Sequence, residues 1–355
     1  MKRVALLYGG RSSEHAISCL SARSVLAVID RERYEVLAVG ITRDGRWTLT
    51  DGRIEAAAGE LPVVPDDGPT VALVGTRRGP QLVQVDDAGP GTATTSLGHV
   101  DIAFPLLHGP WGEDGTVQGL LATVGVPYVG ADVTASSIGI DKGAMKAAFA
   151  ARGLPQLPYE RVERSAWSAD AQQVAARLAE RLELPWFVKP ARQGSSIGIS
   201  KVGAADQLAE AMALALEHDD VVVIEQGIDG PRELEVGVLG ASELQITAPG
   251  EVVPSHEFYD FEAKYLDASE LRIPADVPDD VCEHVIHLAG EAYRAIGCRG
   301  LARVDFLVAR DGQVVLNEIN TIPGFTPASM FPRLWAAEGI DYGSLVDRLL
   351  ADATV

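Results

Sequence analysis

The sequence predicts an α/β protein that folds into two or three domains. Its 355 residues exceed the length of a typical single domain, and its 47% apolar residues are enough to form cores. In the first third, apolar β-rich runs at 3–10, 35–42 and 101–107 are separated by helical or loop segments. Strands that alternate with crossover segments are typical of a parallel α/β layer.

The first strand ends in two glycines and is followed by a helix. After residues 3–10, apolar side chains recur at helical spacing over 12–30, and a serine can cap the first turn. Segments 51–69 and 86–96 are rich in Asp, Gly, Pro and Thr, so we expect surface loops there. A turn that leads into a helix near residue 130 marks the first predicted domain boundary.

The rest of the chain also mixes helices and strands. After the boundary, the pattern predicts a helix at 171–183, a strand at 185–190, a glycine loop, a strand at 198–202, a helix at 205–217 and a strand at 221–226. It then predicts a strand at 233–240, a helix at 281–297, a hairpin at 301–320 and a helix at 344–352. This order indicates a central α/β unit followed by a unit of sheet plus helices.

The predicted hairpin combines a cation, two carboxylates and an amide. Arg303 and Asp305 lie two residues apart in one apolar strand, and Glu318 and Asn320 lie two residues apart in the next. Because side chains alternate faces along a strand, each pair shares a face, and an Asp-Gly turn at 310–313 joins the strands. If the faces coincide, Asp305, Glu318 and Asn320 form a hard-oxygen site for magnesium and nucleotide phosphate. The alternative is a hairpin with solvated polar ends.

A glycine-rich loop follows the strand that ends in Lys189. Small residues at 193–198 let backbone N–H groups approach an anion closely, so we predict a loop that covers phosphate. Lys142 and Lys189 supply the positive charge that a triphosphate requires in an otherwise acidic chain. The alternative is a plain flexible hairpin, because the loop does not match the Walker pattern and exposed lysines are usually solvated.

Two further segments fit a nucleotide site. The strand at 221–226 ends in Glu225 and Gln226, which can read adenine at a sheet edge. Glu233 follows closely and can bind ribose hydroxyls, although a solvated carboxylate explains it equally well. The aromatic segment 255–269 has no helical or strand period, so we predict a long loop that closes over the site. A plain surface loop is the alternative.

The segment LLHGPWGEDGTVQG has the composition of a strained turn. It sets His108, Glu113 and Asp114 among glycines and a tryptophan, without the HExxH spacing of a zinc site. We predict that these side chains form a polar wall of the substrate site. The alternative is a structural turn whose histidine is hydrogen-bonded by backbone.

The composition excludes several classes of protein. Thirty Lys plus Arg against fifty Asp plus Glu give a formal net charge of -20, so nucleic acid is not an expected partner. Apolar runs fall short of the roughly 20 residues of a membrane span, and the first is too short for a signal peptide. Cys19, Cys282 and Cys298 are odd in number and not clustered, so we expect buried thiols in a reducing cytoplasm and no structural zinc.

Three motifs, taken in order, resemble those of the D-alanine:D-alanine ligases, members of the ATP-grasp superfamily. GGRSSEHAIS resembles the N-terminal substrate turn of that family, and HGPWGEDGTVQG resembles its first signature. The segment from GLARVDF through LNEINTIPG resembles its long second signature, so the match spans nearly the whole chain.

The resemblance implies an α/β fold, α+β overall, with a three-domain ATP-grasp architecture in which the last two domains hold ATP between them. We expect an N-terminal parallel α/β substrate domain at 1–130, a central domain at 131–225 and a C-terminal domain at 226–355. ATP is expected between the sheets of the last two domains. An omega-shaped lid loop at about 254–270 is expected to close over the dipeptide site.

The resemblance also implies the reaction. ATP phosphorylates the carboxylate of one D-alanine, and the amine of a second attacks the acyl phosphate to give D-alanyl-D-alanine, ADP and phosphate for peptidoglycan synthesis. This chemistry needs no protein nucleophile, in agreement with the lack of a Ser-His-Asp or Cys-His motif. The implied cofactors are ATP as co-substrate and two Mg²⁺ or Mn²⁺ ions, and the implied assembly is a cytoplasmic homodimer.

Motif positions assign the substrate residues of the N-terminal turn and of the lid. Glu14 is expected to bind the ammonium group of the first D-alanine, with His108 nearby. Ser195 and Tyr265 are expected to hydrogen-bond to each other and toward Glu14, which latches the lid. Lys264 is expected to reach the transferred phosphate.

Motif positions also assign the reacting centre and the nucleotide site. Arg303 and the backbone N–H of Gly324 are expected to stabilise the tetrahedral oxyanion, and Ser329 is expected to hold the second carboxylate beside Met330. The metal ligands implied are Asp305, Glu318 and Asn320. The residues expected to bind ATP are Lys142, Lys189, Ser195, Glu225, Gln226, Ile228, Glu233, Phe258 and Lys264.

A few positions depart from the family pattern. Gln226 stands where many relatives carry lysine, Gly227 where some carry an aromatic residue, and Met330 where leucine is commoner. Relatives that make D-alanyl-D-lactate tend to lack tyrosine at the position of Tyr265, so we expect an amine nucleophile. The alternatives are a D-alanine:D-lactate ligase, another ATP-grasp carboxylate-amine ligase, or a nucleotide-sensing protein without catalysis.

Overall fold

The N-terminal part of the chain is built on a mostly parallel sheet. The computed structural model describes residues 1–56, 59–86, 92–253 and 270–354. The sheet has the order β3-β2-β1-β7, formed by β1 (Lys2–Gly9), β2 (Tyr34–Ile41), β3 (Trp47–Leu49) and β7 (Ile102–Pro105). Because β1 runs parallel to both β2 and β7, the predicted parallel layer is confirmed. Its helices are α1 (His15–Val28) and α2 (Thr116–Val124).

A small antiparallel sheet extends from this layer. It consists of β4 (Val71–Thr76), β5 (Gly79–Asp86) and β6 (Ala93–His99). The predicted surface loop at 86–96 is therefore wrong for Asp86, which ends β5, and for residues 93–96, which pair with β5. Most side chains of β6 are exposed, so the strand lacks the apolar alternation by which a half-buried strand is recognised.

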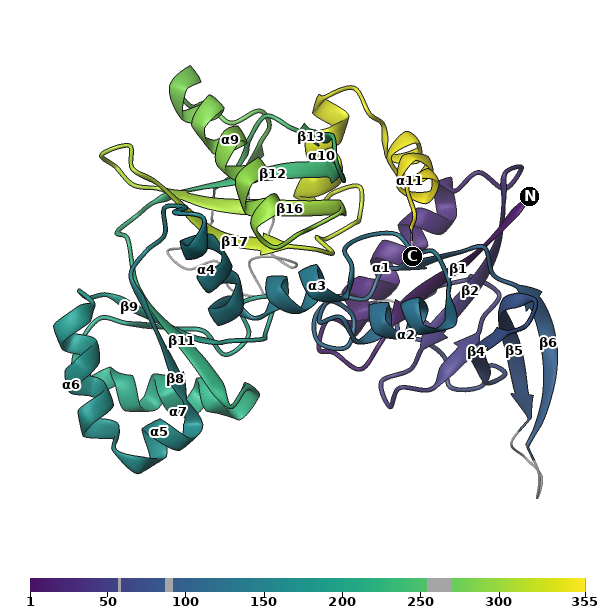
Figure 1. The fold of residues 1–355 in the computed structure, drawn as a ribbon, viewed down its shortest axis with the longest axis horizontal. Helices are drawn as coiled ribbons and strands as arrows, with labels where there is room; N and C mark the ends of the chain where they lie inside the picture. The colour runs from purple at the N-terminus through teal and green to yellow at the C-terminus, as the bar shows by residue number, and fades with distance from the viewer. Residues whose placement is uncertain (57–58, 87–91, 254–269, 355) are drawn as a thin grey trace.

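The central sheet is antiparallel and has the order β10-β9-β11-β8. Its strands are β8 (Tyr159–Glu163), β9 (Trp186–Pro190), β10 (Ser200–Val202) and β11 (Val221–Gln226). The helices on it are α5 (Arg164–Ala169), α6 (Ala171–Arg181) and α7 (Leu208–His218), with a short 3-10 turn, η1 (Ala205–Gln207). Helices α6 and α7 cover one face of the sheet (Figure 1), and their apolar side chains share a core with its strands. The two helices before it, α3 (Val133–Ile140) and α4 (Lys142–Ala151), pack against β17 (Val314–Asn320) of the C-terminal sheet.

The C-terminal sheet has the order β15-β14-β12-β16-β17, and β13 also pairs with β12. Its strands are β12 (Arg232–Gly240), β13 (Leu244–Ile246), β14 (Gly250–Val253), β15 (Glu270–Arg272), β16 (Gly300–Val308) and β17 (Val314–Asn320). Its helices are α9 (Asp279–Ala295), α10 (Met330–Ala337) and α11 (Tyr342–Ala351). The predicted lid at about 254–270 lies outside the described residues except for Glu270, which begins β15.

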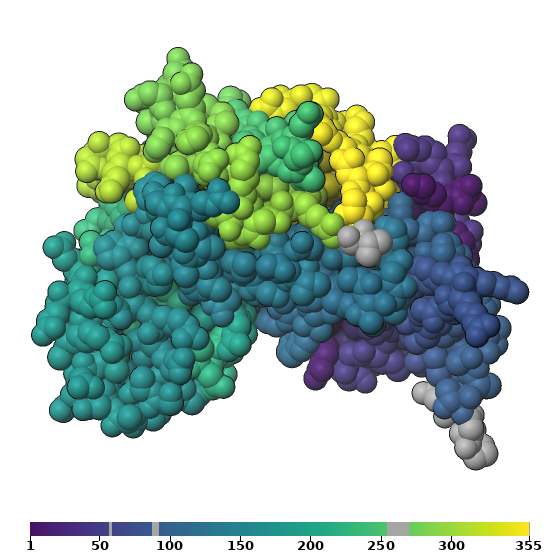
Figure 2. Space-filling view, in the orientation of Figure 1, coloured from purple at the N-terminus to yellow at the C-terminus, as the bar shows by residue number. Residues whose placement is uncertain are grey.

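The two ends of the chain share one hydrophobic core. Phe325, Phe331 and Trp335 pack in the same cluster as residues of β1 and α1, and α11 lies against α1 (Figure 1). In the space-filling view, the green and yellow C-terminal segments rest on both the teal central and the blue N-terminal segments (Figure 2). The predicted domain limits at 130 and 225 remain a prediction. No helix in the described part of the chain is long and apolar enough to span a membrane.

Gly300 sits where the backbone of β16 approaches the segment after α2. Its φ is +76°, and a Cβ there would lie 2.8 Å from Gly130 Cα. Gly297 also has a positive φ, +68°, but a Cβ there would meet no atom within 4 Å.

We expect Gly297→Ala to lower the free energy of unfolding by about 1–2 kcal/mol, since an L-residue is strained at positive φ. Gly300→Ala should lower the free energy of unfolding by more than this, because the backbones at Gly300 and Gly130 must also separate. Urea unfolding checks this, and equal losses in the two variants would contradict the close approach.

Candidate active site

The polar residues of the β16–β17 hairpin meet on one face. Arg303 pairs with Asn320 and Asp305 pairs with Glu318 across the two strands, followed by a bulge between Asp305 and Phe306. The expected register is therefore confirmed, because residues directly opposite each other in antiparallel strands share a face. Asn320 Nδ2 donates a hydrogen bond to Asp305 Oδ2 at 3.0 Å. The role of these residues as metal ligands stays a prediction.

Arg303 is held by two carboxylates. Its Nε and Nη2 atoms donate to the two oxygens of Asp305, both at 2.7 Å, and Nε lies 2.9 Å from Glu235 Oε2. Burial alone would lower the pKa of Arg303, but Asp305 and Glu235 raise it well above the ordinary value. The guanidinium is therefore a fixed positive charge. Glu235 was not predicted from the sequence, although it lies two residues after Glu233 and hence on the same face of β12.

The donor set of the hairpin fits magnesium bound together with a nucleotide. Across the described ranges, no three His, Cys, Asp or Glu side chains converge well enough to hold a metal ion alone. Asp305 and Glu318 supply two hard carboxylates, and Asn320 adds an amide oxygen. Magnesium is usually held by one or two protein carboxylates, with phosphate oxygens and water completing its octahedron.

Two lysines flank a buried carboxylate between the central sheet and α4. Glu225 is 2% exposed, with Lys189 Nζ 2.8 Å from Oε2 and Lys146 Nζ 3.2 Å from Oε1. Burial alone would raise the pKa of Glu225, but the two ammonium groups lower it to about 2. Sequence reasoning missed Lys146. The available signal was its position four residues after Lys142, which places both lysines on one face of α4.

The predicted phosphate loop is anchored at its base. Lys142 Nζ donates to the carbonyl of Gln193 at 2.7 Å. Arg192 forms a two-pronged ion pair with buried Asp219, which also accepts from the Arg192 backbone N–H at 2.9 Å. At the tip, Ser195 and Ser196 have φ of +49° and +57°, a left-handed conformation that non-glycine residues rarely adopt. These contacts hold the loop in a shape that presents Ser195.

The remaining residues expected at the adenine and ribose lie at the end of β11 and the start of β12. Gln226 Oε1 accepts from the Glu183 backbone N–H at 3.0 Å. A Cβ on Gly227 would lie 2.7 Å from the Phe187 ring, so this ring fills the space that a side chain at position 227 would need. Ile228 and Glu233 are partly exposed. Phe258 lies outside the described residues, as do Lys264 and Tyr265.

Glu14 and the phosphate loop meet directly. Glu14 is 6% exposed at the start of α1, and the Ser195 hydroxyl donates a hydrogen bond to Glu14 Oε1. Glycines line the same carboxylate, because a Cβ on Gly109 or Gly194 would lie 2.7 or 3.0 Å from Glu14 Oε2. The expected contact between Ser195 and Glu14 is therefore present in the structure.

His108 and Glu113 tie the polar turn to the segment after β17. His108 Nδ1 lies 3.0 Å from the Ile322 carbonyl and Nε2 lies 3.1 Å from the Ser21 hydroxyl. A carbonyl only accepts, so Nδ1 carries the proton and Nε2 accepts from Ser21. Burial lowers the pKa of His108, which favours this neutral ring. Since both nitrogens bind protein groups, its direct contact with substrate stays a prediction.

The acidic residues of the same turn have different surroundings. Glu113 accepts from the backbone N–H groups of Gly109 at 2.6 Å and Ile322 at 3.2 Å. Desolvation, and then the charge of Glu14, raise the pKa of Glu113 to about 8. Asp114 instead accepts from the backbone N–H groups of Trp111 and Thr116 at 2.8 and 2.9 Å, so it caps the turn.

The residues expected around the second substrate lie between β17 and α10. Ser329 Oγ accepts from the Thr326 backbone N–H at 3.2 Å, and a Cβ on Gly324 would lie 3.2 Å from the same oxygen. Gly324 and Ser329 are therefore close neighbours. Met330 is buried against Val252 and Leu334, and its role in a methyl pocket stays a prediction.

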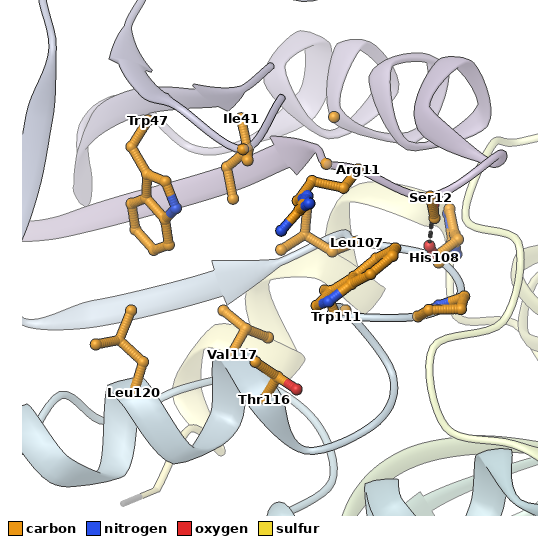
Figure 3. Close-up of a pocket in the computed structure, with 15 residues that line it drawn as sticks. Arg11, Ser12, Ile41, Trp47, Leu107, His108, Trp111, Thr116, Val117 and Leu120 are labelled. Atoms are coloured by element: carbon orange, nitrogen blue, oxygen red, sulfur yellow. Dashed lines mark hydrogen bonds between the residues drawn. The ribbon is translucent and has the colours of Figure 1, made fainter. Parts of the chain in front are cut away.

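An apolar cavity of about 180 Å³ lies beside the polar turn that contains His108 (Figure 3). Its walls include Trp47, Leu107 and Val117, and the Arg11 guanidinium lies 5.0 Å from the centre of the Trp111 ring. The Ser12 hydroxyl donates to the His108 carbonyl at 2.7 Å. This lining does not suit a triphosphate, so the nucleotide residues above define the candidate site.

The raised pKa of Glu113 predicts a pH effect on stability. The folded protein holds the proton up to about pH 8, whereas an unfolded chain releases it near pH 4.3. The folded state therefore binds more protons across this interval, and the free energy of unfolding should fall as pH rises. We expect Glu113→Gln to flatten this dependence in urea titrations between about pH 5 and 8. An identical pH slope in wild type and variant would show that Glu113 is ionised in the folded state.

Comparison with known proteins places this site in a family. Residues 3–131 match the family model of the D-ala D-ala ligase N-terminus, and residues 148–351 match that of the D-ala D-ala ligase C-terminus. The D-alanine--D-alanine ligase of Mycolicibacterium smegmatis is 51% identical over 99% of this chain and 95% of its own length. That of Paenarthrobacter aurescens (strain TC1) is 47% identical over 98% and 94%.

Solved structures agree with this comparison. The D-alanine-D-alanine ligase from Coxiella burnetii has a TM-score of 0.80 at 29% identity, covering 99% of this chain and 95% of that one. The VanG D-Ala:D-Ser ligase from Enterococcus faecalis has a TM-score of 0.82 at 30% identity, with coverage of 99% and 98%. The chain therefore belongs to the D-alanine–D-alanine ligase family and has its ATP-grasp fold.

Proposed function

We propose that this protein is an ADP-forming ligase that joins two D-alanines at the expense of ATP and supplies D-alanyl-D-alanine for peptidoglycan synthesis. The contact between Ser195 and Glu14 carries the proposal, because it joins the phosphate loop to the substrate turn. Matches to both halves of the ligase family support the same activity.

The proposed reaction has two steps. The carboxylate of the first D-alanine attacks the γ-phosphate of ATP, which forms D-alanyl phosphate and releases ADP. The amine of the second D-alanine then attacks the acyl carbon, loses a proton, and phosphate leaves. Each step requires that two bound groups be held close together and that developing negative charge be stabilised.

Side chains of this protein supply the positioning. Glu14 is suited to the ammonium group of the first D-alanine, because it is an acceptor lined by glycines. Arg303 and the backbone N–H of Gly324 are proposed to stabilise the oxyanion, which the fixed charge of Arg303 favours. Ser329 is proposed to bind the second carboxylate beside Met330.

The nucleotide is proposed to lie between the central and C-terminal sheets. Lys142, Lys189 and the loop at Ser195 would face its phosphates, and the end of β11 its adenine. Two Mg²⁺ or Mn²⁺ ions, held by Asp305, Glu318 and Asn320, would neutralise phosphate charge when bound. The buried lysines and hard carboxylates described above support this arrangement.

Three further proposals rest on the family resemblance. Lys264 and Tyr265 are proposed to belong to a lid over the site, and the limits 1–130, 131–225 and 226–355 are proposed as domains. The active form is proposed to be a homodimer in the cytoplasm. The free thiols of Cys19, Cys282 and Cys298 agree with a reducing compartment.

The identity of the second substrate can be tested directly. This chain is 47% and 51% identical to two D-alanine--D-alanine ligases but 30% identical to a D-Ala:D-Ser ligase. The higher identities support D-alanine as the second substrate. We expect ADP release with D-alanine alone, and little added product when D-lactate or D-serine is supplied. Coupled ADP assays with product analysis across pH make the comparison. Preferential depsipeptide formation near neutral pH would overturn the choice of D-alanine, and ATP binding without D-alanine-dependent ADP release would overturn the ligase itself.

Arg303→Met tests the proposed oxyanion role. We expect kcat to fall by on the order of a hundredfold or more, as happens when an oxyanion donor is removed. Nucleotide affinity should change little, because Lys142, Lys189 and Glu225 are untouched. Steady-state kinetics and ADP titration separate the two effects, and near-normal turnover would refute the role.

A further inference from the structure

Three carboxylates stand in a row across three neighbouring strands. On β12 and β16, Glu235 pairs with Asp305, and on β16 and β17, Asp305 pairs with Glu318. Residues directly opposite each other lie on one face, where like charges are destabilising. Cations must therefore accompany the row.

The cations at the two ends of the row differ. On one side, Arg303 contacts Asp305 and Glu235. On the other side, Lys189 contacts Glu225 at 2.8 Å, and the charges of Glu225 first and Glu318 next raise the pKa of the lysine against its burial. A divalent cation bound by Asp305 would compete with Arg303 for the same two oxygens.

Glu235 is placed to resolve that competition. It is 9% exposed, and its Oε2 forms an ion pair at 2.9 Å with Arg303 Nε, whose N–H donates its hydrogen bond to Asp305 Oδ1. Glu235 belongs to neither the expected metal ligands nor the expected substrate residues. We propose that Glu235 is a positioning residue that retains the guanidinium of Arg303 when Asp305 binds a divalent cation.

The proposal has two measurable consequences. Without the charge of Glu235, the guanidinium should stay on Asp305, so a divalent cation should bind more weakly. Arg303 should also be misplaced for the oxyanion. Only this catalytic consequence rests on the proposed function, because cation binding needs no turnover.

The experiment compares wild type with Glu235→Gln, Arg303→Met and the double variant. Electron paramagnetic resonance measures free Mn²⁺ in the presence of ADP without D-alanine, and the ADP assay gives kcat and KM. We expect Glu235→Gln to weaken Mn²⁺ binding and lower kcat, each by roughly 10–100-fold, as for other partners of metal-site residues. The KM for ATP should change much less. In the Arg303→Met background, Glu235→Gln should change neither quantity, because the competing guanidinium is gone.

Glu251→Gln is the matched control. Glu251 is also a buried glutamate of this sheet and is held by Arg232 through contacts of 2.6 and 2.9 Å. It pairs with Leu234, one residue from Glu235 and therefore on the other face. We expect this variant to lose stability while its Mn²⁺ affinity and kcat stay at wild-type values.

Several outcomes would overturn the proposal. One is a Glu235→Gln variant that keeps the wild-type Mn²⁺ affinity or kcat. Another is a loss of Mn²⁺ affinity on Glu235→Gln that is equally large in the wild-type and Arg303→Met backgrounds, because Glu235 would then act on the cation directly. If Glu235→Gln does not fold, the comparison of Arg303→Met with the double variant still decides, because the proposal requires equal Mn²⁺ affinities. Absence of D-alanine-dependent ADP release in wild type would defeat the proposed function but leave the Mn²⁺ comparison intact.

Discussion

The antiparallel register of β12, β16 and β17 is the constraint on which the rest of the site depends. It sets Glu235, Asp305 and Glu318 side by side, with Arg303 two residues before Asp305 on the same face. A shift of one residue in any strand would turn its charged side chain to the opposite face, which packs on α9 in a hydrophobic core. Burial of the apolar face therefore also fixes the position of the charges.

The site is completed by segments that are distant in sequence. Glu14 comes from the N-terminal turn, Ser195 from the phosphate loop of the central sheet, and Ile322 from the end of β17. His108 binds the carbonyl and Glu113 the N–H of Ile322, so the substrate wall is held to the segment that follows β17. The shared core of α1, α10 and α11 stabilises this arrangement, because it joins both ends of the chain.

Local patterns predicted much of this structure, because strand alternation and turn residues act over a few positions. The β16–β17 hairpin, its register and the parallel N-terminal layer all follow from such signals. Lys146 and Glu235 were missed because their importance lies in partners 79 and 68 residues away, Glu225 and Arg303. The strand β6 was missed because its exposed side chains lack alternation. The pairing of Ser195 with Glu14 was expected only from the family resemblance, since the two residues lie 181 positions apart.

The central claim is that β16 and β17 direct their oxygen ligands at one divalent cation bound with the nucleotide. The most direct measurement is the anomalous difference density of a crystal grown with Mn²⁺ and ADP. The account predicts a manganese peak within coordination distance, roughly 2 Å, of oxygens from both Asp305 and Glu318. A peak bound by neither carboxylate, with ADP in place, would contradict it.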